Sequence, residues 1–390
     1  MLINSTISSF KREMREIGSD RLYLSIVLLL PIVMILFFAI IFYRGTIEDV
    51  PIVVVDRDYT TLSRKMLSMI DSTSGVDIAF EEADMWSAER RMLDGEVTAI
   101  IYIDKGFERS IYRGEKGSVG CYLCGTNISA SGVASRDIQQ AVQTFSAGVA
   151  LQTLLGMGVE YDEAMVEIMP INVQSNIISN PYLNYGYYLA PTFMILGIVI
   201  FTVLASIYAL GRELRYRTAS KWLVVANGSL VGGVVGKLLP ITIAMMLMSQ
   251  LIYLILFVVM GMECEGSYLI LSLVTLLLII VYEGVALSVI ALTANMRLAL
   301  SLGGGYSVMA FTFSGITLPT MAMYGVARVF TRLFPLGYFS EIFVGVVMRG
   351  APLSYNVDNV AYMALFLVIV PLSWRRLERV VCDEKYWGRE

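Results

Sequence analysis

The chain has 390 residues, of which 56% are hydrophobic and 16% charged, and its formal net charge is −4. The charged fraction lies well below the roughly 25% of an ordinary soluble protein, which excludes a wholly soluble fold. The chain contains no histidine. It therefore lacks the commonest general base and the commonest metal ligand, which argues against a histidine-dependent enzyme or metal centre.

Segment 4–20 has the pattern of an amphipathic helix. Its apolar residues recur at spacings of three and four, and charged residues fill the opposite face. The apolar residues are Ile7, Phe10, Met14 and Ile17, and the charged residues are Lys11, Arg12, Arg15 and Glu16. We expect residues 1–21 to lie in the membrane interface, with Phe10, Arg12, Met14 and Arg15 as the key positions. The helix is either a simple anchor or a strut that contacts a partner.

Six apolar runs have the composition of bilayer helices. They lie near residues 22–43, 187–210, 238–262, 268–292, 298–323 and 357–374. The first run is longer than a signal-peptide core and has no small-residue cleavage site before Tyr43, so we interpret it as a membrane span. A Gly/Pro break lies at the outer end of the fifth run, and the apolar residues 320–350 favour re-entrant helices, which are tolerated where protein or water satisfies the backbone.

Basic residues set the predicted orientation. With six spans, all the Lys and Arg clusters next to the spans fall on one side, which should be the cytoplasm. The clusters are Lys11, Arg12, Arg15 and Arg21; Arg212, Arg215, Arg217 and Lys221; Arg297; and Arg375, Arg376 and Arg379. Residues 44–185 carry 11 Lys and Arg against 20 Asp and Glu, a net charge of −9, which leaves +5 for the rest. Both termini, including a tail at 375–390, are then cytoplasmic, and the acidic segment lies outside.

Residues 44–182 form an insert between the first span and a five-helix domain at 183–374. Apolar runs at 51–56, 76–80, 97–103 and around Val119 predict strands. Helical patterns occupy 59–71, 84–93, 107–112 and 131–155, and a last strand is expected at 170–173. The alternation predicts an extracytoplasmic α/β domain. It has no Gly-rich phosphate loop or catalytic motif, so binding or docking fits better than catalysis.

Cys121 and Cys124 form a C-x-x-C sequence within one of these predicted strands. Positions three apart on a strand point to opposite faces, which disfavours a local disulfide. We favour a packing role, with a redox or metal role or pairing elsewhere as the alternatives. Cys264 and Cys382 fall on opposite sides of the predicted membrane and cannot pair with each other.

Two charged residues fall in or beside membrane spans. Lys237 opens the third span, and we expect its ammonium group to reach the interface along its flexible stem. Glu283 lies inside the fourth span, where an isolated charge is costly, so it should face protein or water. It is either a substrate or gating contact, or a structural hydrogen-bond partner of Gln250 or a tyrosine.

These features resemble the transmembrane subunits of ABC-2 type exporters, in particular the bacterial branch with a large extracytoplasmic domain. The loop from Gly211 to Ala226 is similar to the family's charged loop, although Arg217 stands where Gly is usual and Ala226–Asn227 where Pro is usual. The insert matches through Val53–Asp58 and Asp94–Ile103. The fifth run matches through Ser314, Gly315 and Pro319, and the outer segment through 335–339 and 349–350.

The resemblance implies an α-helical polytopic permease in the bacterial inner membrane. Two such subunits, as a homodimer or related heterodimer, would pair with cytoplasmic ABC ATPases. The chain has no G-x-x-x-x-G-K-[ST] sequence, so ATP and Mg²⁺ are expected on the ATPase subunit, and no catalytic residue, metal or cofactor on this chain. Six loop residues are the expected ATPase-coupling contacts: Arg212, Glu213, Arg215, Thr218, Lys221 and Trp222.

The resemblance also implies a translocation path at the dimer interface, lined by the second and fifth spans. Its candidate residues are Tyr187, Phe193, Glu283, Phe311, Ser314, Gly315 and Pro319. We expect export of a small hydrophobic or amphiphilic, drug-like compound, with membrane lipids around the chain and a periplasmic adaptor and outer-membrane channel as further partners. Nucleic acid is not expected. Export of lipid or polysaccharide is the alternative, and a membrane-tethered sensor or a polytopic enzyme is less favoured.

Overall fold

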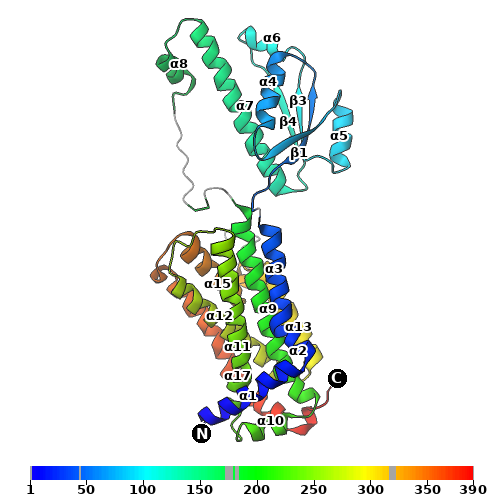
Figure 1. Cartoon of the computed structure of the whole chain (residues 1–390), viewed down its shortest axis with the longest axis vertical. Helices are drawn as coiled ribbons and strands as arrows, with labels where there is room; N and C mark the ends of the chain where they lie inside the picture. The colour runs from blue at the N-terminus through cyan, green and yellow to red at the C-terminus, as the bar shows by residue number, and fades with distance from the viewer. Residues whose placement is uncertain (1, 44, 172–178, 181–183, 316–321, 390) are drawn as a thin grey trace. The chain divides into compact units, whose positions relative to one another are not determined.

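The computed structural model describes residues 2–43, 45–171, 179–180, 184–315 and 322–389 (Figure 1). The chain divides into two compact units, one made of Met1–Gly45 with Ile178–Glu390 and the other of Thr46–Ile177. We call the first the helical unit and the second the insert domain.

The insert domain is a four-stranded sheet with helices on both faces. Its strands are β1 (Val50–Asp56), β2 (Val76–Glu81), β3 (Ala99–Ile103) and β4 (Val119–Leu123), in the order β2-β1-β3-β4. β1 runs parallel to β2 and β3, and β4 is antiparallel to β3. The helices are α4 (Thr61–Asp71), α5 (Met85–Leu93), α6 (Phe107–Tyr112), α7 (Ile128–Gly156) and α8 (Tyr161–Ile168). The expected α/β domain is present, while the strand expected at 170–173 extends outside the described residues.

The central strand β1 shows why this sequence forms a two-faced layer. Ile52 and Val54 point to the face covered by α4 and α7, and Val53 and Val55 point to the face covered by α5. All four side chains are buried. Alternate residues of a strand face opposite sides, so a continuous apolar run is what a sheet covered on both faces requires.

Asp58 joins the end of β1 to the start of α6. Its Oδ1 accepts a hydrogen bond from the Gly106 amide at 2.7 Å, and its Oδ2 accepts one from the Glu108 amide at 3.0 Å. Burial alone would raise the pKa of Asp58, but the backbone hydrogen bonds and the Thr60 hydroxyl together lower it below the ordinary 3.8. The charged form of Asp58 therefore stabilises this corner of the domain.

Cys121 is not packed as the sequence predicted. All four cysteines are free, and the side chain of Cys121 on β4 is exposed, so its expected packing role is wrong. Cys124 lies 3.0 Å from the Thr126 hydroxyl. Since β4 is an edge strand of the sheet, its outer residues have no neighbouring strand to cover them.

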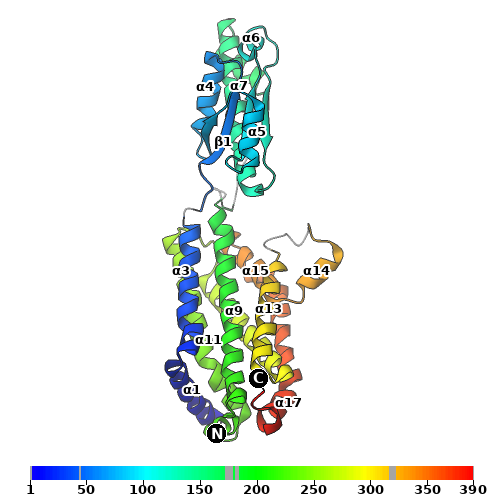
Figure 2. The ribbon, with the colours of Figure 1, turned by 90° about the vertical axis from the view of Figure 1, so that its right-hand side faces the viewer.

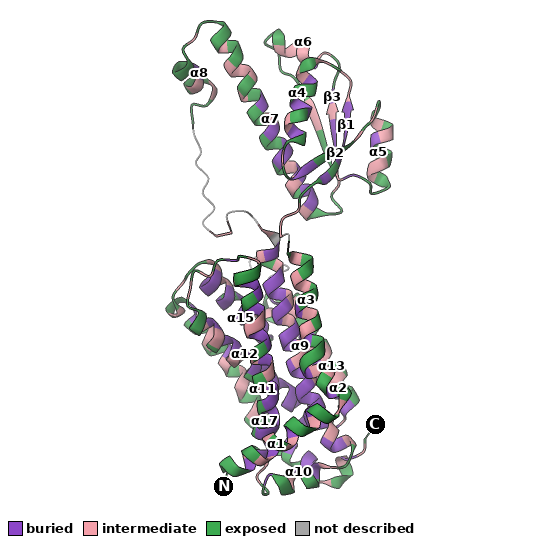
Figure 3. Ribbon diagram, in the orientation of Figure 1, coloured by how far each residue is buried: buried purple, intermediate pink, exposed green. Residues whose placement is uncertain are grey.

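The helical unit begins with α1 (Leu2–Ser19) and α2 (Arg21–Leu24), followed by η1 (Ser25–Leu29) and α3 (Leu30–Phe42). After the insert domain come α9 (Tyr185–Arg215), α10 (Ala219–Val225), α11 (Leu230–Leu254), η2 (Ile255–Val259), α12 (Tyr268–Thr293) and α13 (Met296–Thr312). The chain ends with α14 (Gly325–Thr331), α15 (Pro335–Phe343), η4 (Val344–Met348), η5 (Leu353–Asn356), α16 (Val357–Leu365), η6 (Phe366–Val368), α17 (Ile369–Cys382) and η7 (Glu384–Tyr386). Buried residues concentrate along α9, and α1, α10 and the end of α17 gather at one end of the unit (Figures 2 and 3).

Five helical segments of the described residues are long and apolar enough to cross a membrane. They are Arg21–Phe42, Gly186–Arg215, Leu230–Val259, Tyr268–Thr293 and Leu353–Cys382. The pair Gly325–Thr331 and Pro335–Met348 passes the same test together but bends by 87°, as in a broken span or a re-entrant loop. The bend fits the predicted re-entrant helices and a broken span equally well.

Two predicted spans differ from the observed helices. The fifth was expected over 298–323, but α13 ends at Thr312 after 17 residues, and Pro319 lies outside the described residues. The sixth was expected over 357–374, whereas its helical segment continues to Cys382. The expected tail is also packed: the Trp387 indole donates to the Val380 carbonyl at 3.2 Å, and the Gly388 amide donates to the Leu214 carbonyl at 2.9 Å.

Candidate functional site

Helix α1 packs against α11 through small residues. Ser5 and Ser9 are buried on α1, and a Cβ atom placed on Gly236 of α11 would lie 2.3 Å from the Thr6 carbonyl oxygen. No side chain fits there, so glycine permits the close approach of the two backbones. The Ser9 hydroxyl also donates to the Gly233 carbonyl at 2.9 Å.

This packing shows which face of α1 meets the other helices. Of the predicted apolar face, Ile17 is buried, whereas Ile7 and Met14 are 47% and 51% exposed. The helix therefore turns its polar Ser5–Ser9–Glu13 stripe toward the other helices and leaves apolar side chains outward. An outward apolar face is what an interfacial helix would present to lipid.

The central feature of the site is the ammonium group of Lys237, which is buried on α11 between two carboxylates. Lys237, Glu13 and Glu213 are each 1% exposed. The Lys237 Nζ atom lies 3.0 Å from Glu213 Oε1 on α9 and forms a second ion pair with Glu13 Oε2 on α1. The expectation that Lys237 reaches the interface is wrong, because these carboxylates provide its counter-charge inside the protein.

Further side chains form hydrogen bonds and an ion pair with the carboxylates of Glu13 and Glu213. Arg12 Nη2 lies 2.9 Å from Glu213 Oε1, and the Thr218 hydroxyl donates to Glu213 Oε2 at 2.5 Å. The Tyr23 hydroxyl donates to Glu13 Oε1 at 2.6 Å. Burial raises the pKa of Glu13, while Lys237 and Tyr23 oppose that rise. A buried ion pair needs such additional hydrogen bonds to offset the loss of hydration.

A second layer of charge surrounds this core. The Tyr208 hydroxyl donates to Asp20 Oδ2 at 2.8 Å, and Arg212 Nη1 lies 3.6 Å from the same oxygen. Burial alone would raise the pKa of Asp20, but Tyr208, the backbone amides of Tyr23 and Leu22, and Arg212 together lower it. We call the whole set the ionic cluster; its members are Arg12, Glu13, Glu16, Asp20, Tyr23, Tyr208, Arg212, Glu213, Thr218 and Lys237.

Trp222 connects α10 to the same helices. Its indole nitrogen donates to Ser9 Oγ at 3.0 Å, and its ring centroid lies 5.5 Å from Lys237 Nζ. Trp222 is 1% exposed, like Glu213. Their own chain covers the side chains of Trp222 and Glu213 in this structure, so a contact of either side chain with a partner stays a prediction. Among the other expected contacts, Lys221 is exposed and Arg215 is half-buried.

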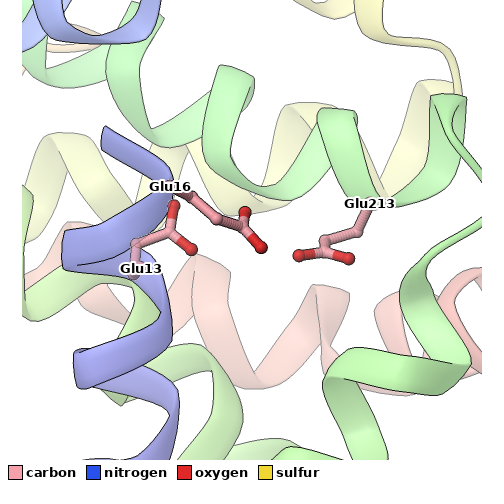
Figure 4. A group of neighbouring side chains, drawn as sticks. All are labelled: Glu13, Glu16 and Glu213. Carbon is pink, nitrogen blue, oxygen red and sulfur yellow. The ribbon is translucent and has the colours of Figure 1, made fainter. Parts of the chain in front are cut away.

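Three carboxylates of the cluster point toward one another: those of Glu13, Glu16 and Glu213 (Figure 4). Their oxygens lie within 4.8 Å of one another, a spacing that could hold a metal ion. However, Lys237 Nζ and Arg12 Nη2 are already within ion-pair distance of these oxygens. The positive charge that a metal would supply is present on the chain itself.

The loop between α9 and α10 accounts for the unusual residues noted in the sequence. Arg217 has φ = 58°, in the left-handed region that favours glycine, the residue usual at this position in the resembled family. Asn227 has φ = 49° and is followed by Gly228 with φ = 76°. Arg217 and Asn227 both adopt the left-handed conformation. Asparagine is a residue type that tolerates this conformation.

The expected path residues separate into two groups. Phe193 on α9 lies 5.0 Å, centroid to centroid, from both Phe311 on α13 and Phe38 on α3. Tyr187 instead donates to the Met260 carbonyl at 3.0 Å. The Ser314 hydroxyl donates back to the Phe311 carbonyl at 2.7 Å, and Gly315 has φ = 83°. The structure thus joins Phe193 with Phe311, at the contact of the second and fifth apolar helices.

Glu283 lies apart from this aromatic contact. Its side chain is buried on α12, and its Oε1 accepts a hydrogen bond from the Thr242 hydroxyl on α11 at 2.7 Å. The expected partner Gln250 instead contacts Tyr268 and Ser249. No basic side chain forms an ion pair with Glu283 within the described part of the chain. Glu283 therefore has a hydrogen-bond partner, Thr242, other than those expected, and its role in transport stays a prediction.

Comparison with known proteins assigns the family. A family model for ABC-2 family transporter proteins matches residues 21–374. The chain belongs to the ABC-2 transporter family. It is therefore a multi-pass membrane component of a transporter, and the family works with an ABC ATPase subunit. No curated protein sequence matches the chain.

A solved structure is similar to part of this family member. It is the crystal structure of a domain of a candidate ABC type-2 transporter from Thermotoga maritima MSB8. The match has 26% sequence identity, covers 31% of this chain and 81% of that chain, and has a TM-score of 0.24.

Proposed function

We propose that this permease is the membrane subunit of an ATP-driven exporter, and that the ionic cluster carries force from its ATPase to the membrane helices. The observation behind this proposal is the burial of Lys237 between Glu13 and Glu213. These residues belong to α11, α1 and α9, so one cluster connects a surface helix to two apolar helices. Tight, discrete packing of this kind moves as a unit rather than deforming smoothly.

The exposed part of the proposed coupling surface is α10 and the turn before it. Arg215, Tyr216, Arg217 and Lys221 are exposed or half-exposed there, and Trp222 on the opposite side of α10 is anchored to Ser9. A load applied by an ATPase to α10 would thus reach α1 through Trp222. It would reach α9 through Thr218, the residue before α10, whose hydroxyl donates a hydrogen bond to Glu213 Oε2 at 2.5 Å.

The proposal includes the topology and the assembly. The protein would lie in a bacterial inner membrane, with the ionic cluster and both termini on the cytoplasmic side and the acidic insert domain outside, and the basic clusters next to the spans support this orientation. Two permease subunits would bind two ATPase subunits, which hold ATP and Mg²⁺. An adaptor and an outer-membrane channel would meet the insert domain.

The proposed substrate is a small hydrophobic or amphiphilic compound. Support comes from the aromatic contact of Phe193, Phe311 and Phe38, which offers ring faces within the apolar helices. Lipid or polysaccharide remains the alternative substrate class, and it predicts the same coupling with a different cargo.

The test is transport into inside-out vesicles that contain the permease and the ATPase encoded beside it. ATP-dependent accumulation of a lipophilic fluorescent dye, absent without ATP and absent with Phe193→Ala together with Phe311→Ala, supports the proposal. Dye accumulation that does not respond to ATP overturns it. Movement of a fluorescent phospholipid, with no movement of the dye, would assign lipid as the cargo class instead.

A further inference from the structure

The insert domain contains a wide groove beside the second half of α7. The first half of this 29-residue helix is packed on the sheet, and its last buried residue is Phe145. Beyond Phe145 the helix extends past the sheet, and Figure 3 shows its residues as half-buried or exposed. The volume beside it, about 960 Å³, is bounded by α7, by the α6–β4 segment and by the end of α8.

The groove is lined by apolar side chains, of which Ile111, Val149 and Leu154 are half-buried and Phe107 is 6% exposed. Phe107 and Ile111 come from α6, and Val149 and Leu154 from α7. Ile111 and Val149 pack against the edge of the buried core of the sheet, so the groove continues the core outward. A contiguous, partly exposed apolar patch often marks a site where a ligand or a partner binds.

The charge of the lining has one sign. Glu115 and Glu167 line the groove, and no Lys or Arg lines it among the residues that the structure describes. Arg113 and Lys116 are neighbours of Glu115 in the chain but do not line the groove. Residues 46–177 as a whole carry 10 Lys and Arg against 20 Asp and Glu. A cation is therefore favoured both by the field of the domain and by the carboxylates in the groove.

We infer that this groove binds a lipophilic cation, a small molecule with an apolar body and a positively charged amine or iminium group. The volume matches the pockets of about 300–1,000 Å³ that hold such ligands. The apolar body lies against Phe107, Ile111, Val149 and Leu154, and the positive group is attracted by Glu115 and Glu167. The site is separate from the ionic cluster and does not depend on ATP or on the ATPase.

The inference is tested by fluorescence polarisation with the full chain in lipid nanodiscs and rhodamine 6G as the cationic probe. Ala150→Trp fills the groove from α7, and Gln152→Trp places the same side chain on an exposed position of α7 that does not line it. We expect Ala150→Trp to weaken binding about tenfold, equivalent to about 1.4 kcal/mol, and Gln152→Trp to leave it unchanged.

A second pair of variants tests the charge. Glu115→Gln with Glu167→Gln should weaken binding several-fold and reduce its dependence on salt, whereas Glu163→Gln, on α8 but outside the groove, should have no effect. Fluorescein, an anion of similar size, should bind far more weakly than rhodamine 6G. The inference is overturned if Ala150→Trp binds the cation like the wild type, or if fluorescein binds as well as the cation. Binding only of an apolar peptide, and of neither dye, also overturns it and assigns the groove to a protein partner.

Discussion

The Lys237 ammonium lies 3.0 Å from the Glu213 carboxylate, although the two residues stand on different membrane helices. Glu13 of α1 completes the ion pair from the other side. Three helices that are far apart in the sequence therefore share one buried charge cluster. This relationship makes the position of α1 dependent on both α9 and α11.

Replacing Lys237 with Met should destabilise the permease strongly. The change leaves Glu13 and Glu213 buried beside each other without their shared cation, and loss of one partner of a buried pair costs about 3–5 kcal/mol. The expected result is a clearly lower melting temperature in detergent. Lys221→Met, at an exposed position on α10, serves as the control and should melt like the wild type. Equal melting of the two variants would contradict the account.

Gly236→Val should detach α1 from α11. The nearest atom to the added Cβ would be the Thr6 carbonyl oxygen at 2.3 Å, and backbone cannot yield as a flexible side chain can. Overpacking of this kind costs about 1–3 kcal/mol. Hydrogen exchange should rise in residues 2–19 and remain unchanged in the insert domain. Gly304→Val is the control, because nothing lies within 4 Å of its added Cβ; unchanged exchange in both variants would show that α1 is not held in this way.

Thr242→Val should lower the stability of the permease more than Glu283→Gln does. Valine removes the hydroxyl that donates to Glu283 and leaves a buried carboxyl without that partner, at a cost of about 1–3 kcal/mol. Glutamine keeps an acceptor oxygen for the Thr242 hydroxyl and should preserve stability. Transport should follow the same order if Glu283 is structural. Full stability with lost transport in Glu283→Gln would assign it a functional role instead.

The insert domain should lose stability in acid through Asp58. The pKa of Asp58 is lowered in the folded domain, so its contribution is complete above the unfolded pKa of about 3.9 and is lost as the pH falls below that value. Asp58→Asn should be less stable than the wild type at pH 6 by about 1 kcal/mol and should show a smaller further loss at pH 3. Calorimetry of the full chain at both pH values measures this difference. If the wild type and Asp58→Asn lost equal stability between pH 6 and pH 3, Asp58 would be excluded as the titrating group.

Much of the fold follows from hydrophobic pattern alone. The strands near Val53, Ile78 and Ile101 and the helix capped by Asp84 were predicted within a few residues, because burial on a sheet demands apolar runs and helix ends demand caps. The fifth span was the main error, since apolar residues continue past Thr312 while the helix ends there. Hydropathy records composition and does not record where a helix breaks.

The ionic cluster could be predicted only in part. The loop residues Arg212, Glu213 and Thr218 were singled out, but Glu13 and Lys237 were not placed beside them. A helical wheel of α1 ranks Glu13 as a surface residue, and only its i, i+4 spacing from Ser5 and Ser9 marks a buried polar stripe. The partner stripe on α11 is Gly232 and Gly236, spaced four apart. Which polar stripe meets which glycine stripe is decided by tertiary packing.

The most direct test of the coupling account is retention of the ATPase by the purified permease after changes on the two sides of α10. Arg215→Glu at the end of α9, together with Lys221→Glu on α10, reverses the charge of the exposed coupling surface and should release the ATPase, whereas Lys116→Glu in the insert domain should not. Trp222→Phe removes only the indole hydrogen bond to Ser9 and should retain the ATPase while lowering transport per ATP hydrolysed. If the ATPase remains bound to the Arg215→Glu, Lys221→Glu permease with normal coupling, α10 is not the contact and the central claim is wrong.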